Sequence, residues 1–109
     1  MNNKHHPKTK LTLVAEAALE PRLLAELKRH QALQNIVAVL AEAGARPEHV
    51  VRLTWFVTSK EEYLAAQEPL GAAYREVMGR HFPPMSVVEV RALMEDRAKV
   101  EIEVTAVLP

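Results

Sequence analysis

Several stretches of the chain carry the alternating or β-branched patterns of β-strands. Leu11 to Ala15 is a short alternating run that predicts a first strand. Val50 to Thr58 predicts a second strand with one apolar face, formed by Val51, Leu53, Trp55 and Val57, and a second face formed by Arg52, Thr54, Phe56 and Thr58. Two further runs, Ser86 to Ala92 and Lys99 to Leu108, flank the charged turn Glu95 to Arg97, which predicts an antiparallel hairpin.

Apolar residues at helical spacing occur in the first two of the three intervals between these predicted strands. From Pro21, which suits a first helical turn, apolar residues recur at three- and four-residue intervals as far as Gly44, a natural C-cap. A second helix is expected from Ser59, a capping residue with a glutamate three positions on, to Gly79. Pro69 lies inside it and predicts a break or bend within residues 67–71.

Together, these strands and helices predict an α+β fold with two helices on one face of a small mixed sheet. One parity of the last two runs is apolar and is expected to lie under the helices: Val88, Val90, Ala92, Val100, Ile102, Val104 and Ala106. The other parity, which includes Met85, Val87, Glu89, Arg91, Glu101 and Glu103, mixes apolar and charged residues. Such a face is either solvated in a monomer or buried against symmetry mates, and its balanced charges favour a homo-oligomer.

Length and composition narrow the class of protein. With 109 residues, 49% of them hydrophobic, residues 1–109 suit one domain, preceded by a flexible arm over residues 1–10. There is no cysteine, which fits a cytoplasmic location and removes Cys-bearing zinc sites. The opening residues are polar and are followed by only a short apolar run, so neither a signal peptide nor a membrane span is expected.

Charge and residue types weigh against several kinds of partner. Fourteen basic and 14 acidic residues cancel, which weighs against a nucleic-acid surface. Asp96 is the sole aspartate and the three glycines are far apart, so magnesium loops and phosphate-binding Gly-rich turns are excluded. His5 and His6 are adjacent on the arm, and His30, His49 and His81 have no partner four residues away. We therefore expect no metal site and no catalytic histidine.

Four segments, in order and in register, resemble one known family. They are Gln31 to Ala45, Val50 to Thr54, Pro83 to Val90 and Val100 to Val104. They are similar to the RidA (YjgF) family of reactive-intermediate deaminases, formerly labelled endoribonuclease L-PSP. The resemblance implies a chorismate-mutase-like α+β fold and a homotrimer with ligand clefts between subunits. It also implies a hydrolase that converts enamine and imine intermediates to 2-keto acids and ammonia without a metal or cofactor.

The resemblance also assigns candidate site residues. In the family an arginine in a Pro-x-Arg-Ser segment clamps the substrate carboxylate, and this chain has Met85 in the corresponding segment, followed by Ser86 and Val87. The glutamate that helps to place the attacking water matches Glu101, and a helix asparagine matches Gln67. The family's N-terminal hairpin is shortened here. Methionine cannot pair with a carboxylate, so the resemblance with this exchange predicts weakened or lost deaminase activity.

Several alternatives stay open at this stage. Glu101 is either a functional carboxylate or a strand residue paired with Arg52 or Arg91, and Met85 is pocket wall, trimer contact or core. For Trp55 the apolar strand face favours core packing over ligand stacking. The leading hypothesis is a trimer that binds a small metabolite in its clefts. The alternatives are a non-catalytic sensing or regulatory module and, against the neutral charge, an endoribonuclease.

Overall fold

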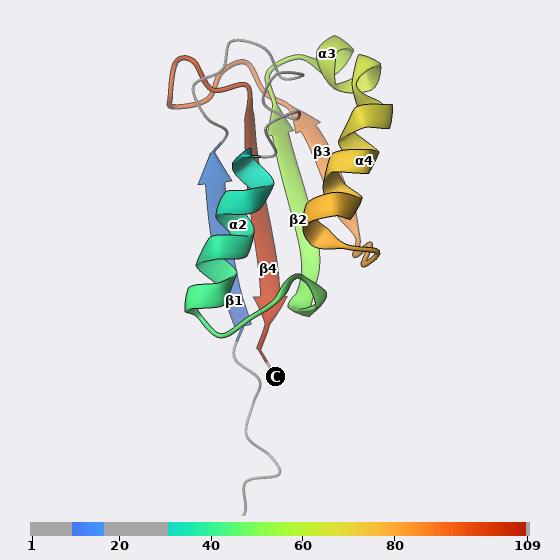
Figure 1. The fold of residues 1–109 in the computed structure, drawn as a ribbon. Helices are drawn as coiled ribbons and strands as arrows, with labels where there is room; N and C mark the ends of the chain where they lie inside the picture. Colours follow the sequence, from blue (N-terminus) through green and yellow to red (C-terminus); the bar gives the residue numbers. More distant parts are fainter. Residues whose placement is uncertain (1–9, 17–30, 109) are drawn as a thin grey trace, which may run out of the picture.

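The computed structural model describes residues 10–16 and 31–108, which form a four-stranded mixed sheet with its helices on one side (Figure 1). The sheet runs in the order β1 (Lys10–Glu16), β4 (Val100–Val107), β2 (Val50–Val57) and β3 (Met85–Glu89). Strand β4 is antiparallel to both of its neighbours, whereas β3 is parallel to β2. The α+β class and the strand expected near Leu11 are confirmed.

Three α-helices and a 3₁₀ turn connect these strands. They are α2 (Gln31–Glu42), η1 (Pro47–His49), α3 (Lys60–Ala65) and α4 (Gln67–Met78). Helix α2 ends at Glu42, and the predicted cap Gly44 lies in the turn that follows, with a φ of 80°; the Ala45 N–H donates to the Leu40 carbonyl oxygen at 2.8 Å. The predicted start of this helix at Pro21, like the arm at residues 1–9, lies outside the described residues.

The second predicted helix is divided, as the proline indicated. Ser59 caps α3, because its Oγ accepts a hydrogen bond from the Glu62 N–H at 3.1 Å, and the Glu89 carboxylate accepts another from the Lys60 N–H at 2.8 Å. The interruption falls at Ala66, one residue before the predicted interval. Pro69 therefore lies in the first turn of α4, where a missing N–H costs the helix no internal hydrogen bond.

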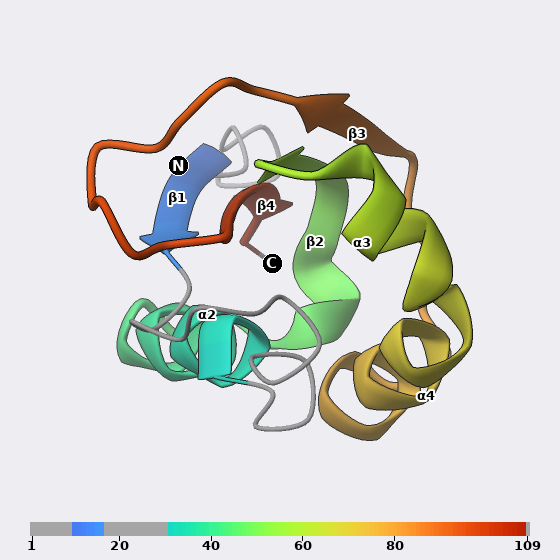
Figure 2. The same cartoon turned by 90° about the horizontal axis from the view of Figure 1, so that it is seen from above.

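The core lies between the helices and the inner strands. Seen from above, α2 and α4 lie on the same side of the sheet, and the connection 90–99 runs around the other side (Figure 2). Strand β4 alternates as predicted, and its buried residues are Val100, Ile102, Val104 and Ala106. They meet the buried faces of α2 (Ala32, Leu33, Ile36, Leu40) and α4 (Leu70, Ala73, Tyr74, Met78).

The predicted hairpin of the last two strands is wrong. Strand β3 pairs in parallel with β2, and β4 crosses over to lie between β1 and β2. Because paired residues point to the same face of a sheet, Met85 faces the helices with Leu53, while Val88 shares the other face with Phe56. Val88 is 41% exposed and Ala92 is also exposed, so the residues expected under the helices from this strand are not there.

The predicted apolar face of β2 needs a smaller correction. The pairing of β2 with β4 shifts between Val50 and Arg52, which indicates a β-bulge at Val51. The extra residue moves Val50 into the core, where it is fully buried, and leaves Val51 46% exposed. From Leu53 onward the predicted alternation holds.

Candidate functional site

A cavity of about 370 Å³ lies between the helix-facing side of β2 and β3 and the helices α3 and α4. Its lining residues are Leu53 and Trp55 from β2, Met85 from β3, Tyr63 from α3, Gln67, Leu70, Gly71 and Tyr74 from α4, and Phe82 and Pro83 from the connection. Every one of them is uncharged. A largely apolar hollow with a few polar groups is the usual form of a small-molecule site.

One side of the cavity is held by a short chain of contacts around Tyr74. The Tyr74 hydroxyl donates a hydrogen bond to the His81 carbonyl oxygen at 2.7 Å, and its ring stacks on Phe82 with centroids 5.5 Å apart. The His81 Nε2–H in turn donates to the Val50 carbonyl oxygen at 2.6 Å, which ties this connection to the start of β2. Burial raises the pKa of the Tyr74 phenol, so it stays a protonated donor at neutral pH.

The polar groups of the lining are few and neutral. The Tyr63 phenol is hydrogen-bonded to the Gln67 side chain, and burial, only partly offset by that bond, raises its pKa. Trp55 is 1% exposed and belongs to the core, as its strand face indicated. It also lines the cavity, and its indole N–H has no acceptor among the described residues.

Two of the predicted site residues meet in this cavity. Met85 and Gln67 both line it, from β3 and from the first turn of α4. Val87 pairs with Trp55 and so points to the same side of the sheet, but it is not part of the lining. Met85, which the resemblance matches to the family's arginine, therefore lies in the cavity wall.

The other two predicted site residues lie on the opposite side of the sheet. Glu101 pairs with Phe56, and Ser86 pairs with Thr54, so both face away from α3 and α4. Arg52, one of the rival partners considered for Glu101, shares this face and pairs with Thr105. Within one chain, the candidate carboxylate and the cavity are separated by the thickness of the sheet.

The sequence family of the chain follows from a match of its residues 12–108 to the family model "Endoribonuclease L-PSP". The chain belongs to this family. The L-PSP family is the RidA (YjgF) family that the four sequence segments resembled.

Relatives and solved structures agree with this placement. A RutC family protein of Synechocystis is 34% identical over 106 residues, which cover 91% of this chain and 78% of that protein. One from Pasteurella multocida is 32% identical over 77 residues, or 71% of this chain and 59% of its own length. A YjgF/YER057c/UK114 family structure from Mycobacterium tuberculosis, 27% identical, matches with a TM-score of 0.73 over 91% of this chain and 79% of its own. A Rid family protein of unknown function from Yersinia pestis, 28% identical, reaches 0.76 over 94% and 80%.

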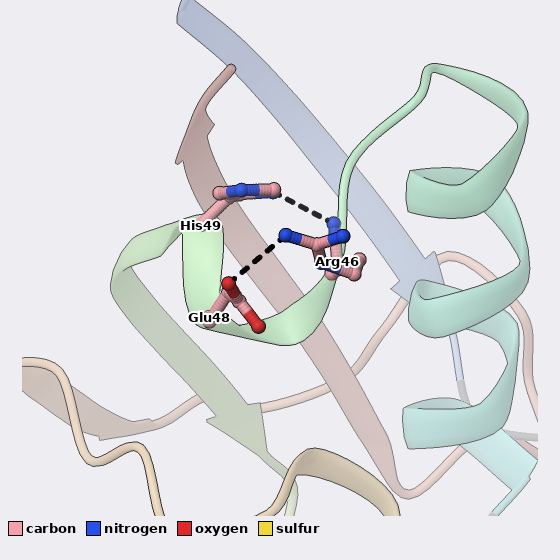
Figure 3. Close-up of polar contacts among 3 residues, drawn as sticks. All are labelled: Arg46, Glu48 and His49. Carbon is pink, nitrogen blue, oxygen red and sulfur yellow. Dashed lines mark hydrogen bonds and ion pairs between the residues drawn. The ribbon is translucent and has the colours of Figure 1, made fainter. Parts of the chain in front are cut away.

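The histidines of this L-PSP family member have structural contacts where they are described. His49 closes the turn before β2, because its Nδ1 accepts the Arg46 N–H at 2.9 Å beside an Arg46–Glu48 ion pair of 3.1 Å (Figure 3). His81 is bound to Val50. Residues 10–16 and 31–108 contain no group of three metal-ligating side chains, and none of their helices is long and apolar enough to cross a membrane.

Sequence reasoning missed most of the cavity lining. Tyr63, Tyr74 and Phe82 were not proposed as site residues, although they are three of the four tyrosines and phenylalanines in the chain. Their gathering depends on the break at Ala66 and on the parallel placement of β3 next to β2. The signal that could have found them is the scarcity of aromatic residues in the chain, together with the place of Phe82 directly before the segment Pro83 to Ser86.

Proposed function

We propose that this chain is a homotrimeric RidA-like protein of the cytoplasm that holds a small metabolite in the cavity between α3–α4 and β2–β3. Its imine and enamine deaminase activity toward 2-imino acids is weakened or lost. The observation that carries the proposal is Met85 in the wall of a cavity whose lining residues are all uncharged. The cavity offers a ligand apolar surface and a few neutral polar groups, and no guanidinium at the position where the family's carboxylate clamp is expected.

The chemistry of that clamp explains the expected loss. A guanidinium binds a carboxylate through two parallel charge-assisted hydrogen bonds, and these both hold and orient the substrate. A thioether has no donor to offer, although it fills a similar volume. With Met85 in the wall, a 2-imino acid would leave its carboxylate without this partner, so both its binding and its orientation toward water would suffer.

The position of the candidate base supports the same conclusion. A general base must come within hydrogen-bonding reach of the water that it activates. The described lining contains phenol and amide groups but no carboxylate, and Glu101 faces the other side of the sheet. A single chain therefore lacks the pair of groups that the family's hydrolysis requires.

The edge strand β3 supports assembly with further copies. Within the described sheet β3 pairs on one side only, and its apolar residues Met85, Val87 and Val88 are 47%, 37% and 41% exposed. Phe82 at the cavity is 63% exposed. A neighbouring copy over this edge would bury these residues and close the mouth of the cavity. Light scattering at micromolar concentration should give three times the mass of one chain, and a monomer would contradict the trimer.

Metabolite binding is tested by thermal unfolding with a panel of 2-keto acids and neutral metabolites. A ligand present at about a hundredfold excess over its Kd should raise the midpoint by about 10 °C. Met85→Trp, which narrows the cavity mouth, should abolish the shift, whereas Met94→Trp, at a 93% exposed position outside the lining, should retain it. A shift that survives Met85→Trp would contradict binding at this site.

A second candidate is a non-catalytic sensing or regulatory module. The separation of Glu101 from the cavity by the sheet favours it, because a binding module needs the hollow but not the base. Such a module would bind a metabolite and release it unchanged. Conversion of any imine or enamine by the purified protein would contradict this second candidate, while binding without conversion would support it.

A further inference from the structure

One cationic side chain lies beside the cavity without belonging to its lining. Gly71 lines the cavity from the second turn of α4, and Arg75 follows one turn later on the same face of that helix. A Cβ placed on Gly71 would be 3.3 Å from Arg75 Nη1, so the guanidinium lies directly over the glycine. Long helical side chains fold back toward the helix N-terminus in this way.

The absent side chain at Gly71 is what makes this position available. A distance of 3.3 Å is tighter than ordinary van der Waals contact, so even alanine would press against the guanidinium. The glycine has an ordinary helical backbone within α4, where glycine is a poor helix former. Backbone geometry therefore does not require glycine here, and the space it leaves is taken by Arg75.

The guanidinium is also not engaged elsewhere. Among residues 32–108 the Arg75 side chain makes no hydrogen bond or ion pair and is exposed. Its charge is permanent, because arginine is not deprotonated in proteins. The Arg75 guanidinium thus lies against Gly71, whereas the residues that line the cavity are all uncharged.

The remaining polar groups of the wall define what a ligand must bring. The Trp55 N–H is a donor without a described acceptor, and the Tyr74 O–H is already committed to the His81 carbonyl oxygen. A ligand that suits this cavity has an apolar body and an acceptor-rich, negatively charged end.

We propose that Arg75 is a specificity-determining residue, whose guanidinium pairs over Gly71 with the carboxylate of a small ligand with an apolar body. This inference rests on the proposed metabolite site, and it places the cation of that site on α4 instead of on β3. The carboxylate would then lie at the rim of the cavity near α4, with the apolar body of the ligand toward Leu53. Such a pose differs from one in which a guanidinium at position 85 holds the carboxylate.

Trp55 gives a direct readout, because it is the one tryptophan of the chain and lines the cavity. Its fluorescence is titrated with 4-methylpentanoate and with 4-methylpentanamide, which share an apolar body and differ in charge. The wild-type trimer should bind the carboxylate about three- to tenfold more tightly than the amide, a modest preference because the ion pair is partly exposed. Added salt should weaken carboxylate binding and leave amide binding unchanged.

Two variants and one control isolate the role of Arg75. Arg75→Gln should remove the preference by weakening carboxylate binding alone, and Gly71→Ala should reduce it by displacing the guanidinium while favouring the helix. Arg80→Gln changes an exposed arginine outside the lining and should keep the preference. Equal binding of both ligands by the wild type, or a preference that survives Arg75→Gln, would overturn the inference and leave the proposed site standing. Binding of neither ligand would overturn both.

Discussion

Met85 lies directly opposite Leu53 in the parallel ladder of β2 and β3, and both residues line the same cavity. They differ in burial, because Leu53 is 1% exposed in the sheet interior and Met85 is 47% exposed at its edge. Leu53 therefore forms the floor of the cavity and Met85 its mouth. An exchange at the mouth therefore costs the fold less than an exchange at the floor.

This difference predicts unequal costs of truncation. Leu53→Ala should lower the free energy of unfolding by about 2–5 kcal/mol, because it removes buried methyl groups and leaves a void. Met85→Ala should cost less than Leu53→Ala, since within the chain Met85 is 47% exposed at the edge of the sheet. Urea denaturation of both variants measures the two values. Equal costs would mean that Met85 is a core residue, contrary to its place at the cavity mouth.

The start of α3 should depend on the Ser59 cap. Ser59→Ala removes the acceptor of the Glu62 N–H and should cost about 0.5–2 kcal/mol. Ser59→Asp keeps a capping oxygen and serves as the matched control, with a cost near zero. Because α3 carries Tyr63 into the cavity, Ser59→Ala should also weaken ligand binding. Unchanged stability and binding in Ser59→Ala would contradict a structural role for this cap.

Stability should fall at alkaline pH through Tyr74. Burial raises the pKa of its phenol above the 10.0 of an exposed tyrosine, so the unfolded chain loses its proton first. The contribution is fully present below about pH 10 and is lost as the pH rises through the folded-state pKa. Unfolding in urea at pH 8 and at pH 10.5 should therefore give a lower stability at the higher pH.

Tyr74→Phe separates this effect from general alkaline unfolding. It should cost about 0.5–1.5 kcal/mol at neutral pH through the lost hydrogen bond to the His81 carbonyl oxygen, and it should flatten the alkaline decline. Tyr63→Phe is the comparison, with a smaller effect because its bond to Gln67 opposes the rise in its pKa. An alkaline decline of the same size in Tyr74→Phe would contradict the assignment.

The name of the family, endoribonuclease L-PSP, raises the question of RNA cleavage, and the net charge of the chain predicts that the protein does not bind RNA. Fourteen basic residues are balanced by 14 acidic ones, so the chain has no net positive charge to support the salt-dependent phosphate contacts that drive nucleic-acid binding. At low ionic strength, single-stranded RNA should not be retained by the protein in a filter-binding assay. Retention that disappears with added salt would contradict this prediction.

The sequence was sufficient for most of the fold, and it singled out two residues that line the cavity, Met85 and Gln67. Caps leave local signals, so Ser59 and Gly44 were found, and the regular alternation of Val100 to Ala106 identified the buried face of β4. The parity of β3 was not predictable, because apolar residues occupy both of its faces, Met85 and Val87 on one and Val88 on the other. Topology decided the matter, since a parallel partner and a crossover leave no local mark.

The candidate site residues likewise lie on both faces of the sheet, and the sequence alone does not show which face each residue occupies. Met85 and Gln67 both line the cavity, whereas Glu101, which the resemblance assigns to the same site, faces the other side of the sheet within one chain. A family resemblance supplies residue types but not the face on which one chain presents them. Val51 is a similar case, because one extra residue at a bulge turned an apolar position outward without any change of pattern.

The most direct test of the central claim is the rate of pyruvate release from 2-aminoacrylate, generated by a pyridoxal-phosphate-dependent dehydratase, with and without the protein. The wild type should leave the rate close to that in buffer. Met85→Arg should raise it about tenfold or more by supplying the bidentate carboxylate partner, while Met94→Arg, at an exposed methionine outside the cavity, should not. Strong acceleration by the wild type, with no further gain in Met85→Arg, would contradict the account.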